Sequence, residues 1–247
     1  MTNVPFPIAR IAIERTVRLV GTARLRDPVL LKLATERYQD DLAEIEGATS
    51  GRLVAQQQGI EGLQARELVG GLPHARFINA AFAYYRPREL NRFNGPGRGA
   101  WYAALHVETC QIEVAFHLTR ELQRVNDFDA VVDYAEMFAS FAGEFVDLRS
   151  VSPRPVCLHP DSTIGYAAGN ALAELVRSSS HNGIVYPSVR HHEGTCLVAL
   201  WPAAVQSVAQ GRVLRATWAG SPTPEWSELT SSLGRADENM ADELWGP

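Results

Sequence analysis

The sequence RFNGPGRGAWYAALHVETCQIEVAFH, residues 92–117, combines an arginine–aromatic–asparagine triplet, a Gly/Pro turn, an aromatic-rich segment and an amphipathic stretch with an internal glutamate. The apolar segment Trp101–Leu105 predicts a strand, and the periodicity of His106–Val125 predicts a helix. Glu108 falls in the first turn of that helix, where a negative charge is favoured by the helix dipole. This stretch therefore indicates mixed α and β structure.

The segments on either side continue the mixture of strands and helices. Phe77–Tyr85 is apolar and predicts a buried strand or a short helix, and Arg92–Asn94 predicts a short strand tip. Residues 128–146 predict a strand at Ala130–Tyr134 together with a turn or helix. Further strands are expected at 15–22, 183–187, 195–201 and 206–218, and further helices at 162–178 and from Asp27-Pro28 onward. The fold class expected is α+β, with a central β core and surrounding helices.

The length of 247 residues allows one large domain or two small ones. Residues 1–14 look like an irregular lead-in, and residues 15–218 are expected to form a single mixed domain. Residues 219–247 are polar and acidic, with prolines near both ends, which predicts a tail.

The composition favours a globular protein and argues against a nucleic-acid-binding, membrane or secreted one. The chain is 46% hydrophobic and 21% charged, as in globular proteins, and its net charge of −5 argues against nucleic acid or an anionic membrane as the main partner. No window has the apolar length of a membrane span, and the N-terminus lacks the apolar core of a signal peptide. Three widely spaced cysteines without a CxxC motif favour a reducing cytoplasm.

Glu113 is the first candidate for chemistry. At about 100° per residue, it shares one helix face with Thr109, Phe116 and His117, and Ile112 and Phe116 flank it. A partly buried carboxylate needs partners. Glutamates are mostly exposed, however, so a solvated or paired side chain is the commoner explanation for an isolated one.

Arg92, Asn94 and Tyr102 are the second group of candidates. An arginine fork can bind phosphate, an asparagine can bind sugar hydroxyls, and nearby glycines let the backbone approach a ligand. Trp101 and Tyr102 alternate on the strand, so one is expected to face inward and the other outward, and a tyrosine can stack on a flat ring. An ordinary hairpin turn and core packing would explain the same residues.

Ser188 stands where an apolar strand gives way to a polar loop, a position that often carries functional groups. No G-x-S-x-G motif surrounds it, which argues against a hydrolase nucleophile. A turn hydroxyl is the simpler explanation.

Two other clusters have weaker support. Glu113 with His117, His191, His192 and Glu193 has a spacing that permits a metal site, but it matches no recognised ligand motif. The paired glutamates Glu44 and Glu46 resemble those of some ADP-ribosyltransferases, although they lie in an acidic run that is typical of a solvated face.

The order of these motifs resembles the RES domain, which is named for its arginine, glutamate and serine. The matching series is Arg-Phe-Asn, a glycine-rich turn, Trp-Tyr-Ala-Ala, Glu-Thr, Glu-Val-Ala-Phe-His, and then Ile-Val-Tyr-Pro-Ser-Val-Arg. The resemblance is strongest over residues 92–117 and 183–201. It implies a fold like that of the ADP-ribosyltransferases.

The resemblance also implies roles for single residues. Arg92, Tyr102 and Glu113 would be catalytic, and Arg92, Tyr102, Arg18, Asn94 and Ser188 would bind NAD+. The second arginine of the site is assigned to Arg18, and its rivals are Arg15, Arg24 and Arg86.

The function implied is a toxin that degrades NAD+ by cleaving the nicotinamide–ribose bond, with water, phosphate or a protein as the acceptor. NAD+ would be a substrate, with no metal and no permanently bound cofactor. An Xre-type antitoxin is the expected partner, and self-association is left open. The alternatives are a catalytically inactive nucleotide-binding module and a metal-dependent hydrolase that uses His117, His191 and His192.

Overall fold

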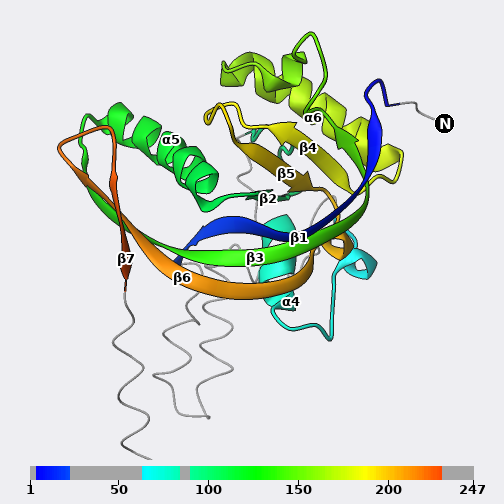
Figure 1. Ribbon diagram of the computed structural model, residues 1–247, viewed down its shortest axis with the longest axis horizontal. Helices are drawn as coiled ribbons and strands as arrows, with labels where there is room; N and C mark the ends of the chain where they lie inside the picture. Colours follow the sequence, from blue (N-terminus) through cyan, green and yellow to red (C-terminus); the bar gives the residue numbers. More distant parts are fainter. Residues whose placement is uncertain (1–3, 23–62, 84–89, 230–247) are drawn as a thin grey trace, which may run out of the picture.

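The computed structural model describes residues 4–22, 63–83 and 90–229, and every structural statement below concerns these residues. They form one mixed α+β arrangement of strands, α-helices and short 3-10 turns (Figure 1). The strands are β1 Ile8–Gly21, β2 Trp101–Ala104, β3 Asp129–Asp147, β4 Gly183–Pro187, β5 Thr195–Ala199, β6 Gln206–Ala219 and β7 Glu225–Leu229. The α-helices are α4 Ala75–Ala83, α5 Val107–Val125 and α6 Ser162–Ser178, and the 3-10 turns are η3 Ala65–Glu67, η4 Val156–Leu158 and η5 Pro202–Ala204.

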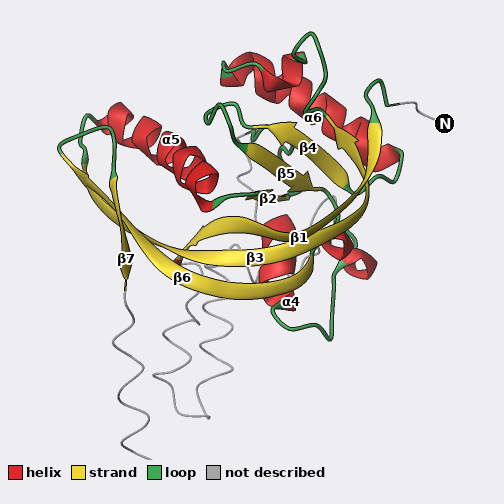
Figure 2. Cartoon of the chain, viewed as in Figure 1, coloured by secondary structure: helices red, strands yellow, loops and turns green. Residues whose placement is uncertain are grey.

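The sheet is organised around the long strand β3. The strand order is β1-β2-β5-β4-β3-β6-β7, and β1 also pairs with β3. The β1–β3 pairing brings the two ends of the β1-to-β3 series together, so these five strands form a closed circuit. The long strands β1, β3 and β6 curve beneath the short strands β2, β4 and β5 (Figure 2). β3 pairs with β4 in parallel and with β1 and β6 antiparallel.

Two apolar cores lie against this sheet. One packs α6 residues such as Leu172 and Val176 against β4 and β1, with Tyr102 at its edge. The other packs Ile78 and Phe82 of α4 against Trp101 and β3. Because neighbouring strand residues point to opposite faces, Trp101 and Tyr102 enter different cores. The two side chains point in opposite directions as expected, but neither faces outward, because each side of β2 is covered by a core: Trp101 is only 1% exposed and Tyr102 packs against the other core.

The helix α6 fixes the segment that precedes β2. Asp161 caps its N-terminus by accepting a hydrogen bond from the Thr163 N–H at 2.8 Å. Gly169 lies directly against the Arg92 carbonyl oxygen, and a β-carbon at this position would collide with it. Asn170 Nδ2 donates to the Asn91 carbonyl at 2.7 Å. Two consecutive residues of α6, a glycine and an asparagine, therefore hold residues 91–92 close to the helix.

Most predicted elements are present, with four corrections. β1 begins at Ile8, inside the predicted lead-in, and a bulge between Ile13 and Thr16 interrupts its alternation with β3. Residues 129–147 form one continuous strand instead of a strand with a turn or helix. Arg92–Asn94 is a bend rather than a strand tip. β7 follows β6 and pairs with it, so part of the predicted tail is a strand.

The ambiguous segment Phe77–Tyr85 belongs to the helix α4, as far as residue 83. The helix expected from Asp27-Pro28, the paired Glu44 and Glu46, and the tail beyond residue 229 lie outside the described residues. Within them, no helix combines the length and the apolar character that crossing a membrane requires.

Candidate functional site

The centre of the candidate site is a hydrogen bond between α5 and the loop after β4. The Ser188 hydroxyl donates to Glu113 Oε1 at 2.7 Å. The same hydroxyl accepts from the backbone N–H groups of Arg190 at 3.1 Å and His191 at 2.9 Å. Ser188 is only 4% exposed. Three hydrogen bonds therefore hold the serine oxygen, and through it they orient the Glu113 carboxylate.

The loop 188–194 lies along one face of α5. Thr109 Oγ1 is 2.9 Å from His191 Nδ1, and the Arg190 guanidinium lies 3.6 Å from the ring centre of Phe116. Together with Glu113, these contacts confirm that Thr109 and Phe116 share a helix face with the glutamate. Ile112, expected to flank Glu113 in an apolar setting, is instead 38% exposed.

Tyr102 organises the arginine–aromatic–asparagine triplet. Its hydroxyl donates to Asn94 Oδ1 at 2.9 Å and accepts from the Phe93 N–H at 2.9 Å. Asn94 Nδ2 in turn donates to the Arg98 carbonyl at 3.1 Å. Burial raises the pKa of the Tyr102 phenol well above its ordinary value, so it remains a neutral hydroxyl. The triplet is therefore tied to β2 by a buried hydrogen-bond network.

Arg92 is buried in this network, with an exposed fraction of 8%. Its Nη1 donates to the carbonyl oxygens of Cys157 at 2.7 Å and His159 at 3.1 Å. The guanidinium carbon lies 5.2 Å from the ring centre of Tyr166 on α6. Arg92 thus secures the chain that enters α6, and Tyr166 lies next to it.

Arg18 reaches the opposite side of β2. Its guanidinium lies 5.0 Å from the ring centre of Trp101, and its Nη1 donates to the Tyr102 carbonyl at 3.2 Å. The rival Arg15 stacks on Phe138 at 3.9 Å. The structure therefore brings Arg18 to the Tyr102 backbone, whereas Arg24 and Arg86 lie outside the described residues.

Tyr186 and Cys196 lie between the arginine–aromatic–asparagine triplet and the Glu113–Ser188 pair. Tyr186 packs edge-on against Phe93, with ring centres 4.9 Å apart. Burial raises the pKa of the Tyr186 phenol well above its ordinary value, and Cys196 and Glu113 raise it further. Cys196 Sγ lies 4.0 Å from Glu113 Oε1, and burial together with Glu113 raises the pKa of its thiol. Neutral groups thus line the inner side of the carboxylate.

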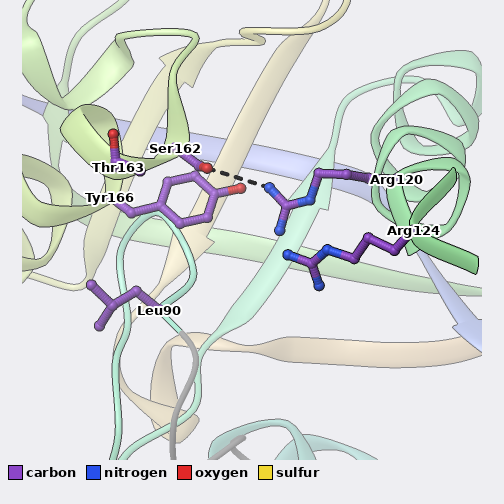
Figure 3. Close-up of a pocket in the computed structure, with 6 residues that line it drawn as sticks. All are labelled: Leu90, Arg120, Arg124, Ser162, Thr163 and Tyr166. Atoms are coloured by element: carbon purple, nitrogen blue, oxygen red, sulfur yellow. Dashed lines mark hydrogen bonds between the residues drawn. The ribbon is translucent and has the colours of Figure 1, made fainter.

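A pocket of about 240 Å³ opens between α5 and α6 (Figure 3). It is lined by Leu90, Arg120, Arg124, Ser162, Thr163 and Tyr166. The two arginines extend from α5 toward the α6 residues, and Arg120 Nη1 donates to Ser162 Oγ at 3.3 Å (Figure 3). This pocket adjoins Arg92 through Tyr166.

The histidines considered for a metal site do not form one. Among residues 4–22, 63–83 and 90–229, no group of three His, Cys, Asp or Glu side chains could hold a metal ion. His191 is instead engaged with Thr109.

Sequence reasoning did not identify Arg120, Tyr166 or Arg190. Arg120 follows Glu113 by seven residues, so the helical spacing that placed Thr109 and Phe116 on one face would also have indicated Arg120. The contacts of Tyr166 and Arg190 depend on how α6 and the loop pack, which the local pattern does not encode.

The comparison with known protein families agrees with these motifs. The model of the RES domain matches residues 68–219, which is more than half of the chain and leaves β1 outside the match. The structure is similar to a crystal structure of the M. tuberculosis MbcT–MbcA toxin–antitoxin complex, with a TM-score of 0.44 and 15% sequence identity over 92% of this chain and 88% of that chain. No curated protein matches the sequence. Since the family model spans most of the chain, this protein belongs to the RES domain family.

Proposed function

We propose that this protein is a toxin that degrades NAD+ by cleaving the bond between nicotinamide and ribose. The observation that carries the proposal is the Glu113 carboxylate, oriented at 2.7 Å by Ser188, in a chain of the RES domain family. Cleavage of this bond develops positive charge on the ribose, as glycoside hydrolysis does. A fixed carboxylate stabilises that charge, and nicotinamide leaves as a neutral molecule without needing a strong acid.

The other residues would support this step in different ways. Ser188 holds Glu113 in place, because its hydroxyl is already used in that hydrogen bond. Tyr102 would form part of the wall beside the ribose. Asn94 would hold the Tyr102 hydroxyl in place, and Arg92 would fix the chain that enters α6. Arg18 would support Tyr102 from the other side of β2, because its Nη1 donates to the Tyr102 carbonyl. NAD+ is the substrate in this proposal, and no metal takes part.

Membership of the family also supports an antitoxin partner. A protein that consumes NAD+ harms its own cell unless it is neutralised, and the resemblance implies an Xre-type antitoxin that covers the site. The proposed place of action is the cytoplasm, which contains the NAD+ pool.

The direct test is to incubate the purified full-length protein with NAD+ and to measure released nicotinamide. Parallel reactions with water alone, added phosphate and candidate acceptor proteins identify the acceptor through the product: ADP-ribose, its phosphorylated form, or a modified protein. We expect release in at least one reaction. Absence of release in all three would overturn the catalytic proposal and favour a binding module, which would still show affinity for NAD+.

A further inference from the structure

Among the described residues that line it, the pocket between α5 and α6 presents two arginines and no carboxylate. Arg120 and Arg124 are one turn apart on α5, and both side chains extend toward Ser162 and Tyr166 (Figure 3). An arginine fork pairs well with the oxygens of a phosphate group. The pocket therefore has the charge and the donors for a phosphate.

Arg120 carries a buried donor group that has no hydrogen-bond partner among residues 4–22, 63–83 and 90–229. Its Nη1 donates to Ser162 Oγ, but within the described residues its buried Nε has no hydrogen-bond partner. Buried polar groups nearly always have partners, and each exception calls for an explanation. Because Arg120 lines the pocket, a small turn of its side chain would bring this atom to an acceptor oxygen of a ligand bound there.

Arg124 is able to join such a ligand. Its Nη1 is paired with Glu121 at 2.8 Å, but both side chains are largely exposed, the arginine by 60%. Exposed ion pairs of this kind contribute little free energy. The guanidinium can therefore turn its other nitrogens to a phosphate at small cost.

The size of the pocket limits what it holds. Its volume of about 240 Å³ is below the range of roughly 300–1,000 Å³ that is usual for whole small molecules. It suits a single phosphate group with part of its attached sugar.

The N-terminus of α6 is already capped by Asp161, which accepts hydrogen bonds from both Thr163 N and Oγ1. A phosphate in the pocket would therefore be bound by the two arginines and Ser162 rather than by the end of the helix.

We infer that this pocket is a phosphate-binding subsite formed by Arg120, Arg124 and Ser162. Arg92, the arginine first assigned to phosphate, uses its Nη1 on two carbonyl oxygens and is separated from the pocket by Tyr166. The phosphate belongs either to the dinucleotide or to free phosphate. The dinucleotide source rests on the proposed function, whereas binding of free phosphate does not depend on it.

The experiment is a calorimetric titration of the full-length protein with inorganic phosphate and, separately, with ADP-ribose, in phosphate-free buffer. The variants are Arg120→Gln, Arg120→Lys and Arg124→Gln. Arg177→Gln is the matched control, because Arg177 also pairs with a glutamate three residues away, near the far end of α6. Thermal unfolding of each variant verifies that it is folded.

We expect Arg120→Gln to weaken binding by at least about tenfold, the effect of losing one charge-assisted hydrogen bond, with a smaller loss for Arg124→Gln. Arg120→Lys should recover part of the lost affinity, because the positive charge remains. If the glutamine variants bind inorganic phosphate more weakly than the wild type, free phosphate is the ligand. If they bind only ADP-ribose more weakly, the phosphate belongs to the dinucleotide. Unchanged binding of both in the two glutamine variants, or no binding by the wild type, would overturn the inference, even where nicotinamide release is intact.

Discussion

Two glutamates of this protein, Glu113 and Glu136, lie in very different surroundings. Glu136 in β3 is 2% exposed and receives Nε and Nη2 of Arg212 at 3.1 and 3.0 Å, as well as its backbone N–H. Glu113 on α5 receives a serine hydroxyl, and no ion pair involving it is found in the described part of the chain. One carboxylate is neutralised in place, and the other is oriented by a neutral donor.

Under the proposed function, this difference separates a structural carboxylate from the carboxylate that takes part in the reaction. The Arg212 fork matches the charge of Glu136, which leaves it little capacity to stabilise another cation. Glu113 keeps its charge available to a positive group that arrives later, which is what a developing oxocarbenium ion requires. In this proposal, the charge of the hydrogen-bond partner therefore distinguishes Glu113 from Glu136.

The largest effect is expected for Glu113→Gln. The amide keeps the size of the side chain but removes the negative charge, so nicotinamide release should fall about 100- to 1,000-fold. The thermal midpoint should change little, because the variant leaves no charge unpaired. Initial rates of nicotinamide release measure this effect. A variant with the wild-type rate would show that Glu113 has no part in the reaction.

Ser188→Ala should have the next largest effect. It removes the donor to Glu113 and the acceptor for two backbone N–H groups, so the carboxylate is no longer held in one orientation. We expect a loss of about 10- to 100-fold in kcat with a smaller change in KM. Ser178→Ala on α6, which loses only a hydroxyl bonded to a helix carbonyl, is the control. Equal rates for the two variants would contradict the positioning role.

Gly169→Ala tests the contact between α6 and Arg92. The added methyl group would meet the Arg92 carbonyl and the Phe93 ring, so the helix must shift. The expected cost is about 1–3 kcal/mol in the free energy of unfolding, measured by denaturant titration. Gly70→Ala is the matched control, because a β-carbon there meets nothing within 4 Å. A similar stability for both variants would show that this close approach is unimportant.

The smallest effect is expected for the contribution of the Glu136–Arg212 pair to stability, which depends on pH. Burial would raise the pKa of Glu136, but the hydrogen bonds and charge of Arg212 outweigh it, and the pKa is lowered. The pair therefore adds stability above the ordinary carboxyl pKa, and this contribution is lost as the pH falls through the lowered pKa.

Glu136→Gln should cost about 1 kcal/mol at neutral pH, since Arg212 is half exposed and solvent screens the pair. The variant should also lose less stability than the wild type on acidification. Urea unfolding at pH 7 and pH 3 measures both quantities. An equal pH dependence in the two proteins would contradict the lowered pKa.

Local sequence patterns were sufficient to predict the helix that carries Glu113 and the strand that carries Tyr102. The helical periodicity of α5 and the apolar run of β2 were sufficient to locate Glu113 and Tyr102 on their elements. The length of β3 was not predicted, because bulges such as that between Ala135 and Met137 interrupt its alternation. Local irregularity therefore concealed a continuous strand.

Long-range partners escaped prediction for a different reason. The partners of Arg92 come from residues 65 and 67 positions later in the chain, a distance over which no local pattern applies. The same holds for Glu113 and Ser188, which are 75 residues apart and were connected only through the family resemblance. The motif therefore predicted which residues form the site, whereas the arginines that line the pocket follow from how α5 and α6 pack.

The measurement that tests the central claim most directly compares wild type, Glu113→Gln and Glu136→Gln in one series, with nicotinamide release and the free energy of unfolding determined for each. The account predicts that Glu113→Gln loses activity and retains stability, whereas Glu136→Gln retains activity and loses stability. If both variants lost activity in proportion to their stability, the distinction between the two carboxylates would be contradicted.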